Sequence, residues 1–118
     1  MTRILVSHSE VPIMRFLHSF FAAKGYETFS SPPKTVVHWI RVIAPDVLIL
    51  DPADINLLAW DFNLMASTPM LLINTYDPYL KEAATILRGA EMRVSKHRTP
   101  TNPRRLVRAV KMLLKETE

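Results

Sequence analysis

The sequence predicts an α/β domain in which five strands alternate with five helices and form one parallel sheet, with helices on both faces. The clearest strand, residues 47–50, is an unbroken aliphatic run, which is typical of a parallel strand buried on both sides. Most of the segments between the strands repeat apolar residues at helical spacing. Connections this short favour right-handed crossovers, and these require parallel strands.

The chain begins with a strand, a helix and a second strand. Residues 3–7 form a short apolar run, and residues 12–24 carry apolar side chains every three or four positions, as an amphipathic helix does. Gly25 stops this helix, because glycine readily adopts the backbone conformation that ends one. Residues 26–30 then alternate in polarity like a half-buried strand.

The middle of the chain contains a second helix and two buried strands. Residues 33–44 place apolar side chains on one face, and Pro45 ends this helix. The aliphatic strand at 47–50 follows, and then an irregular segment with a short helix at 57–65. The next apolar run, residues 70–75, is expected to be the fourth strand.

Two helices and one strand complete the predicted fold. The helix at 77–89 starts with an Asp-Pro cap and ends at a glycine. Residues 91–96 are expected to form the fifth strand. The last helix, residues 103–115, follows an Asn-Pro cap and turns its leucines and valine inward.

Composition excludes several classes of protein. A chain of 118 residues is expected to fold as a single domain, residues 1–118, with a core that needs no disulfide or metal. The absence of cysteine excludes disulfides, thiolate metal sites and cysteine catalysis. The two glycines stand apart, so the chain has no glycine-rich phosphate loop. No apolar run approaches the roughly 20 residues of a membrane span, and we expect a cytoplasmic protein that is not an enzyme.

Basic residues gather at one end of the chain. Residues 88–118 carry nine of the 15 Lys and Arg and three acidic residues, a local net charge of +6. The whole chain has a net charge of +4, so the first 87 residues are slightly acidic. This uneven charge distribution bears on which partners the chain can bind, and it gives no information about the fold.

Asp51 follows the aliphatic strand directly. In an open parallel sheet, ligands bind at the carboxyl ends of the strands, so an acidic residue at this position is a candidate for a functional role. A structural alternative is that its carboxylate only accepts hydrogen bonds at the end of the strand.

Four segments in this order resemble the receiver domain of bacterial response regulators. They are RILVSHSE (residues 3–10), PDVLILD (45–51), TPMLLINT (68–75) and EAATILRGAEMRVSK (82–96). The resemblance implies a flavodoxin-like sheet of order 2-1-3-4-5. It also implies that the aspartate after the third strand accepts a phosphoryl group from a histidine kinase, with Mg²⁺ held by two acidic residues after the first strand. A lysine after the fifth strand would contact the phosphoryl oxygens.

Matched residue by residue, the resemblance assigns the phosphoacceptor position to Asp51 and the lysine position to Lys96. The acidic pair corresponds to His8 and Ser9, neither of which is acidic, although Glu10 follows them. Mg²⁺ prefers oxygen ligands, whereas imidazole suits zinc or copper, so this degenerate acidic pocket is expected to bind Mg²⁺ poorly. We therefore expect no metal or other cofactor, and Mg²⁺ only if Asp51 is a working phosphoacceptor.

The residues that report phosphorylation in the family are also replaced. The hydroxyl residue after the fourth strand corresponds to Asn74, the mobile aromatic of the fifth strand to Arg93, and the proline after the lysine to His97. The resemblance thus implies a receiver fold without its switch.

Three interpretations of the pocket follow. The simplest is that Asp51 has a structural role, with Lys96 as its ion-pair partner and His8 as a second positive group when protonated. Alternatively, Asp51 is a live phosphoacceptor. A third alternative, a transition-metal site of His8, Asp51 and His97, has no supporting ligand pattern in the sequence.

The basic end of the chain predicts an interaction surface. In the last helix the basic residues recur on one stripe opposite the apolar face, and residues of the fourth helix and fifth strand are expected to extend it. The predicted surface consists of Arg93, Arg98, Arg104, Arg108 and Lys111. The usual explanation of such a stripe is a solvated helix face. A second candidate surface is the apolar segment at 55–65.

These observations favour an atypical receiver domain of two-component signalling that works without Mg²⁺-dependent phosphorylation of Asp51. It would act as a protein-interaction or dimerisation module in signal transduction or transcriptional regulation, either free-standing or at the head of a longer regulator. The partner would be a protein or a second copy, bound through the fourth helix, fifth strand and last helix. The alternatives are a phosphoacceptor receiver and a nucleic-acid-binding module that uses the basic last helix, although no recognition motif or interleaved aromatics support the latter.

Overall fold

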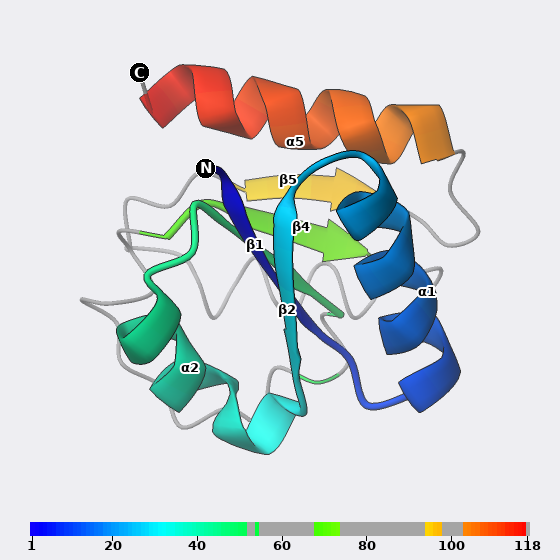
Figure 1. Cartoon of the computed structure of the whole chain (residues 1–118), viewed down its shortest axis with the longest axis vertical. Coiled ribbons are helices and arrows are strands. Elements are labelled where there is room, and N and C mark those ends of the chain that lie inside the picture. The colour runs from blue at the N-terminus through cyan, green and yellow to red at the C-terminus, as the bar shows by residue number, and fades with distance from the viewer. Residues whose placement is uncertain (52–53, 55–67, 74–93, 98–102, 118) are drawn as a thin grey trace.

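The computed structural model describes residues 1–51, 54, 68–73, 94–97 and 103–117. Within these residues the strands form one parallel sheet in the order β2-β1-β3-β4-β5 (Figure 1). The strands are β1 (Arg3–Ser7), β2 (Glu27–Ser31), β3 (Val47–Leu50), β4 (Met70–Ile73) and β5 (Val94–His97). The predicted flavodoxin-like α/β fold is confirmed.

Helices cover both faces of this sheet. Helix α1 (Val11–Ala23) and helix α5 (Pro103–Thr117) lie on one side, and helix α2 (Val36–Ile43) lies on the other (Figure 1). A short 3₁₀ turn, η1 (Pro33–Thr35), leads into α2. None of the described helices is long and apolar enough to cross a membrane.

The alternation of side chains along each strand divides the core into two layers. The layer under α1 and α5 takes every second strand residue and the inner faces of the two helices. Its strand members are Ile4, Val6, Val47, Ile49, Leu71 and Ile73, and its helical members include Leu17, Phe21, Leu106, Val110 and Leu113. The intervening strand residues, including Leu5, Leu48 and Leu72, are buried on the face that carries α2. The central strands are thus buried on both sides, as their unbroken apolar runs predict.

The ends of α1 and α2 show how the chain leaves a helix. Gly25 has φ 92°, and the Tyr26 N–H donates to the Phe21 carbonyl, so the prediction that Gly25 stops α1 is confirmed. Helix α2 ends at Ala44, which takes the same left-handed region with φ 50° and ψ 61°. This conformation is sterically unfavourable for alanine, because of its Cβ, but not for glycine.

The observed bounds differ from the predicted ones in a few places. The helix expected at 33–44 is split into η1, in which the Thr35 N–H donates to the Pro32 carbonyl at 3.2 Å, and the shorter α2. The last helix continues to Thr117, and the fifth strand ends at His97 rather than at residue 96. The helices expected at 57–65 and 77–89 lie outside the described residues.

The left-handed Ala44 predicts a stabilising substitution. Ala44→Gly removes the Cβ clash at the end of α2 and should raise the free energy of unfolding by about 1 kcal/mol. Chemical denaturation followed by circular dichroism measures this change. The matched control is Ala22→Gly, at an exposed position inside α1, which should lower the free energy of unfolding by about 1 kcal/mol. Loss of stability in both variants would contradict the role given to Ala44.

Candidate functional site

The candidate site lies where β1 and β3 end side by side. The two strands are neighbours in the sheet, and Ser7 pairs with Leu50 in their parallel register. The next residue of each strand, His8 and Asp51, therefore leaves the sheet at the same edge. This is the carboxyl edge, on which open α/β sheets bind their ligands.

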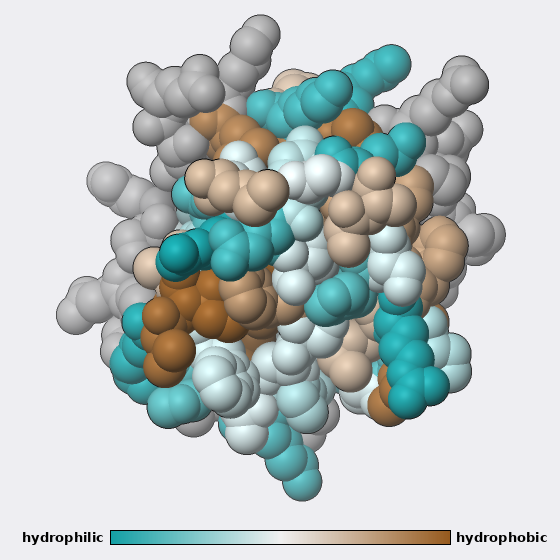
Figure 2. Space-filling model, viewed as in Figure 1, coloured by the Kyte–Doolittle hydropathy of each residue, from teal (hydrophilic) through white to brown (hydrophobic). Residues whose placement is uncertain are grey.

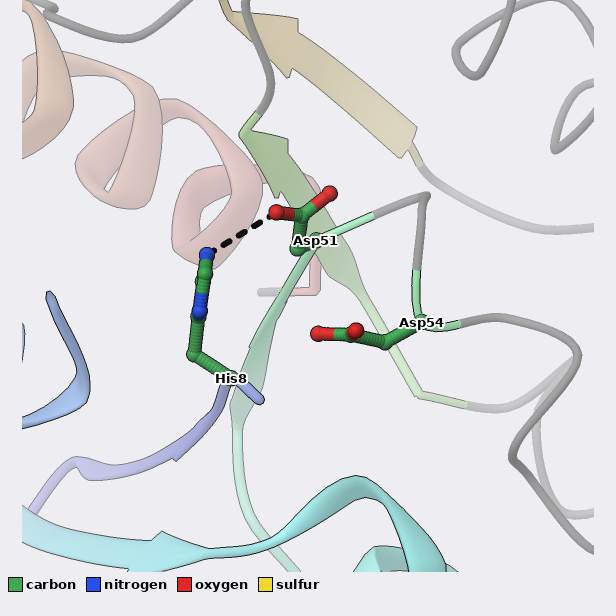
Figure 3. A group of neighbouring side chains, drawn as sticks. All are labelled: His8, Asp51 and Asp54. Carbon is green, nitrogen blue, oxygen red and sulfur yellow. Dashed lines mark ion pairs between the residues drawn. The ribbon is translucent and has the colours of Figure 1, made fainter. Parts of the chain in front are cut away.

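His8 and Asp51 form a buried pair. The distance from His8 Nε2 to Asp51 Oδ2 is 2.9 Å, and the two side chains are 8% and 12% exposed (Figure 3). A hydrogen bond of this length in a site largely closed to water holds both side chains in place.

The second nitrogen of the His8 ring is also engaged. The backbone N–H of Glu10 donates to Nδ1 at 2.9 Å, which requires a lone pair on that nitrogen. The proton of the neutral imidazole therefore sits on Nε2 and is donated to Asp51. Burial by itself lowers the pKa of His8, but the hydrogen bond and charge of Asp51, with the charges of Asp54 and Glu10, outweigh burial and raise this pKa above 6.5.

Asp54 is a third member of the cluster. Its side chain is buried and points toward the His8–Asp51 pair (Figure 3). The Asp54 carboxylate accepts the backbone N–H of Ser9 at 3.0 Å, and the Asp54 N–H donates to the Asp51 carbonyl at 2.9 Å. These bonds tie the turn after β3 to the segment that joins β1 and α1.

Sequence reasoning assigned Glu10 to the pocket, next to His8 and Ser9, and missed Asp54. Glu10 is exposed and precedes α1 without capping it through its side chain. The carboxylate beside Asp51 belongs instead to Asp54, because a single short turn returns the chain to the pocket. The sequence signal for such a turn is in DPAD, where Asp51 is followed by a proline, since turns favour Asp at their first position and Pro at their second.

The other predicted site residues are described in part. Ser9 is exposed and contributes only its backbone N–H. Lys96 and His97 lie in β5, paired with Leu72 and Ile73, but their side chains are outside the described part of the structure. The switch-equivalent residues Asn74 and Arg93 also lie outside it. The expected ion pair between Lys96 and Asp51 thus stays a prediction.

Comparison with known proteins gives a match in structure alone. No family model and no curated protein matches the sequence. Three similar solved structures are the chemotaxis protein CheY4 of Vibrio cholerae, the receiver domain of a histidine kinase from Syntrophus aciditrophicus, and a receiver-modulated diguanylate cyclase from Pelobacter carbinolicus.

These structures cover nearly the whole chain. The TM-scores are 0.72, 0.74 and 0.74, each at 20% sequence identity, and the alignments cover 97%, 100% and 98% of this chain and 99%, 93% and 94% of the others. The chain therefore has the flavodoxin-like fold of receiver domains.

The magnesium ion that this fold family implies does not fit the described pocket. The donor atoms are one imidazole nitrogen and the carboxylates of Asp51 and Asp54. Mg²⁺ demands a near-octahedral shell of oxygen ligands, and imidazole is a poor member of such a shell. His8 is therefore suited to be a hydrogen-bond partner of Asp51 and is a poor ligand for Mg²⁺.

The Asp54 contacts predict how two substitutions will differ. Asp54→Ala removes the acceptor of the Ser9 N–H and should lower the free energy of unfolding by about 1–3 kcal/mol. Asp54→Asn keeps an oxygen for this bond and removes a negative charge close to Asp51. It should therefore lower the free energy of unfolding much less than Asp54→Ala does. Urea denaturation in EDTA measures both changes. Equal losses in the two variants would contradict the hydrogen-bonding role of Asp54.

Proposed function

We propose that the chain is an atypical receiver domain that does not use Mg²⁺-dependent phosphorylation of Asp51 and acts as a protein-interaction or dimerisation module in signal transduction or transcriptional regulation. The observation that carries this proposal is the His8–Asp51 pair, with 2.9 Å between Nε2 and Oδ2. The domain, residues 1–118, works in the cytoplasm and has no enzymatic activity of its own.

The chemistry of phosphoryl transfer supports the first half of this proposal. The reaction depends on positioning and on neutralising charge at the transferred group. In this pocket an imidazole stands in the place of a magnesium ligand, and one oxygen of Asp51 already accepts its hydrogen bond. Asp54 adds a negative charge close to the place where an incoming phosphoryl group would have to sit. Asp51 thus serves as a structural partner of His8.

The outer face of α5 supports the second half. Leu106, Val110 and Leu113 are buried against the sheet, which leaves Arg108 and Lys111 exposed on the opposite side of the helix. Figure 2 shows hydrophilic side chains standing out at the top of the molecule, where α5 lies.

An apolar side chain lies on the same face. Met112 is exposed and is one helical turn from Arg108. A mixed basic and apolar face of this kind suits an acidic protein partner or a less basic face of a second copy. Arg104 is one turn before Arg108 on α5, and the predicted extension through Arg93 and Arg98 lies outside the described residues.

A phosphorylation assay tests the role of Asp51. Incubation with Mg²⁺ and a small-molecule acyl phosphate should leave the intact mass and the oligomeric state unchanged, because the pocket neutralises the incoming charge poorly. Asp51→Asn should keep its fold and partner binding, since the Asn side-chain oxygen can still accept a hydrogen bond from His8 Nε2. A gain of one phosphoryl group in the unmodified protein, lost in Asp51→Asn, would establish a working phosphoreceiver instead.

A double substitution provides the positive control for that assay. His8→Asp combined with Ser9→Asp restores the acidic pair of the family. The added carboxylates repel Asp51 and Asp54, so this variant should be less stable than the unmodified protein in EDTA and recover stability with Mg²⁺. Detectable phosphorylation of this variant alone would assign the inactivity of the unmodified chain to His8 and Ser9.

The α5 face is tested by reversing its charge. Arg108→Glu with Lys111→Glu should weaken self-association or partner binding, measured by analytical ultracentrifugation or pull-down, and should leave the thermal midpoint nearly unchanged because both residues are exposed. Association of the unmodified protein should weaken with salt, since exposed charges are screened beyond about 8 Å at physiological ionic strength.

The matched control places the same charge change on other surfaces. Arg15→Glu with Lys34→Glu alters exposed residues of α1 and η1 and should leave association intact. Equal association in both double variants would move the interface away from α5. DNA binding with a steep salt dependence would favour the nucleic-acid alternative.

A further inference from the structure

One imidazole and two carboxylates converge at the carboxyl edge of the sheet. One ligand atom from each of His8, Asp51 and Asp54 lies within 4.8 Å of the others. His8 comes from the end of β1, Asp51 from the end of β3, and Asp54 from the turn that follows (Figure 3). His8 and Asp54 are buried and Asp51 is nearly so.

Backbone hydrogen bonds position two of these three side chains. Asp54 is held by the Ser9 N–H, and the turn that carries it is closed by the bond from the Asp54 N–H to the Asp51 carbonyl. The Asp54 carboxylate can keep its bond when an ion binds, so ordering this ligand costs little. The His8 ring is held between the Glu10 N–H and Asp51, and an ion exchanges these two bonds for one to the metal.

The charge of the cluster also favours a cation. The carboxylates of Asp51 and Asp54 lie close together in a site with little access to water, where like charges repel strongly. A divalent ion between them turns this repulsion into attraction to the ion.

The donor set determines the class of ion. Zn²⁺ binds both imidazole nitrogen and carboxylate oxygen, so His8, Asp51 and Asp54 can supply three ligands and leave a fourth position for water. The same set is unsuited to Mg²⁺ because of the nitrogen. We propose that His8, Asp51 and Asp54 form a zinc-class transition-metal site in which Asp54 supplies the third protein ligand.

Metal binding at this site changes a contact outside it. Nε2 is the nitrogen that faces Asp51, so the ion replaces the Nε2 proton, and the neutral imidazole then carries its proton on Nδ1. Nδ1 can no longer accept the Glu10 N–H, and this bond must break. Glu10 directly precedes α1, so metal binding changes the hydrogen bonding at the start of this helix.

Calorimetry with ZnCl₂ alone tests the site on EDTA-treated and desalted full-length protein. The expected result is one Zn²⁺ per chain, with no comparable heat from MgCl₂. Asp54→Asn keeps an acceptor for the Ser9 N–H but removes the charged ligand, and it should weaken Zn²⁺ binding at least about tenfold. His38→Gln is the matched control, because His38 is an exposed histidine on α2, and it should bind Zn²⁺ like the unmodified protein.

A spectroscopic measurement provides a second test that does not depend on the variants. In ¹⁵N-labelled protein, ZnCl₂ should shift the backbone amide signals of Ser9 and Glu10 in parallel with occupancy, because both N–H groups bond to ligands of the ion. The absence of a Zn²⁺ heat, equal affinity in Asp54→Asn, or loss of binding in His38→Gln would each overturn the proposal. Equal binding of Mg²⁺ would overturn the assignment to the zinc class. These outcomes are separate from phosphorylation of Asp51, which the acyl phosphate assay measures independently.

Discussion

The arrangement of the pocket depends on the parallel register between β1 and β3. Ser7 pairs with Leu50, so the residues that follow, His8 and Asp51, leave adjacent strands at the same height. This register is held from both sides, because Ile4, Leu5, Val47 and Leu48 are all fully buried. Each such side chain contributes about 1.5–3 kcal/mol on burial. A slip of one residue would turn the apolar set of a strand toward the wrong layer and separate His8 from Asp51.

The features of the fold that could be predicted are those that a short stretch of sequence determines by itself. The unbroken run of β3 requires burial on both faces, and Gly25 supplies the left-handed backbone that ends α1. Ala44 carries no such signal, since it takes the left-handed conformation only because the chain must turn into β3. Asp54 was missed for a similar reason. Its place in the pocket depends on the turn closed by the bond from the Asp54 N–H to the Asp51 carbonyl. That bond is local, but the packed sheet determines the direction in which the turn points.

The imidazole of His8 sets the electrostatics of the described pocket. Three carboxylates at this edge would require a bound cation to be stable at neutral pH. With an imidazole as the third group, the cluster carries one negative charge fewer, and Asp51 gains a hydrogen-bond donor. Asp54 supplies the second carboxylate from the turn after β3. The cluster therefore offers a mixed set of nitrogen and oxygen donors, which suits Zn²⁺ better than Mg²⁺.

The pocket and the α5 face are connected through α1 and the core. The Glu10 N–H bonds to His8, and the Glu10 carbonyl accepts the Met14 N–H in the first turn of α1. Farther along α1, Phe21 belongs to the same core cluster as Val110 of α5. Because Glu10 both bonds to His8 and begins α1, this helix is the element through which a change at His8 would reach the core under α5.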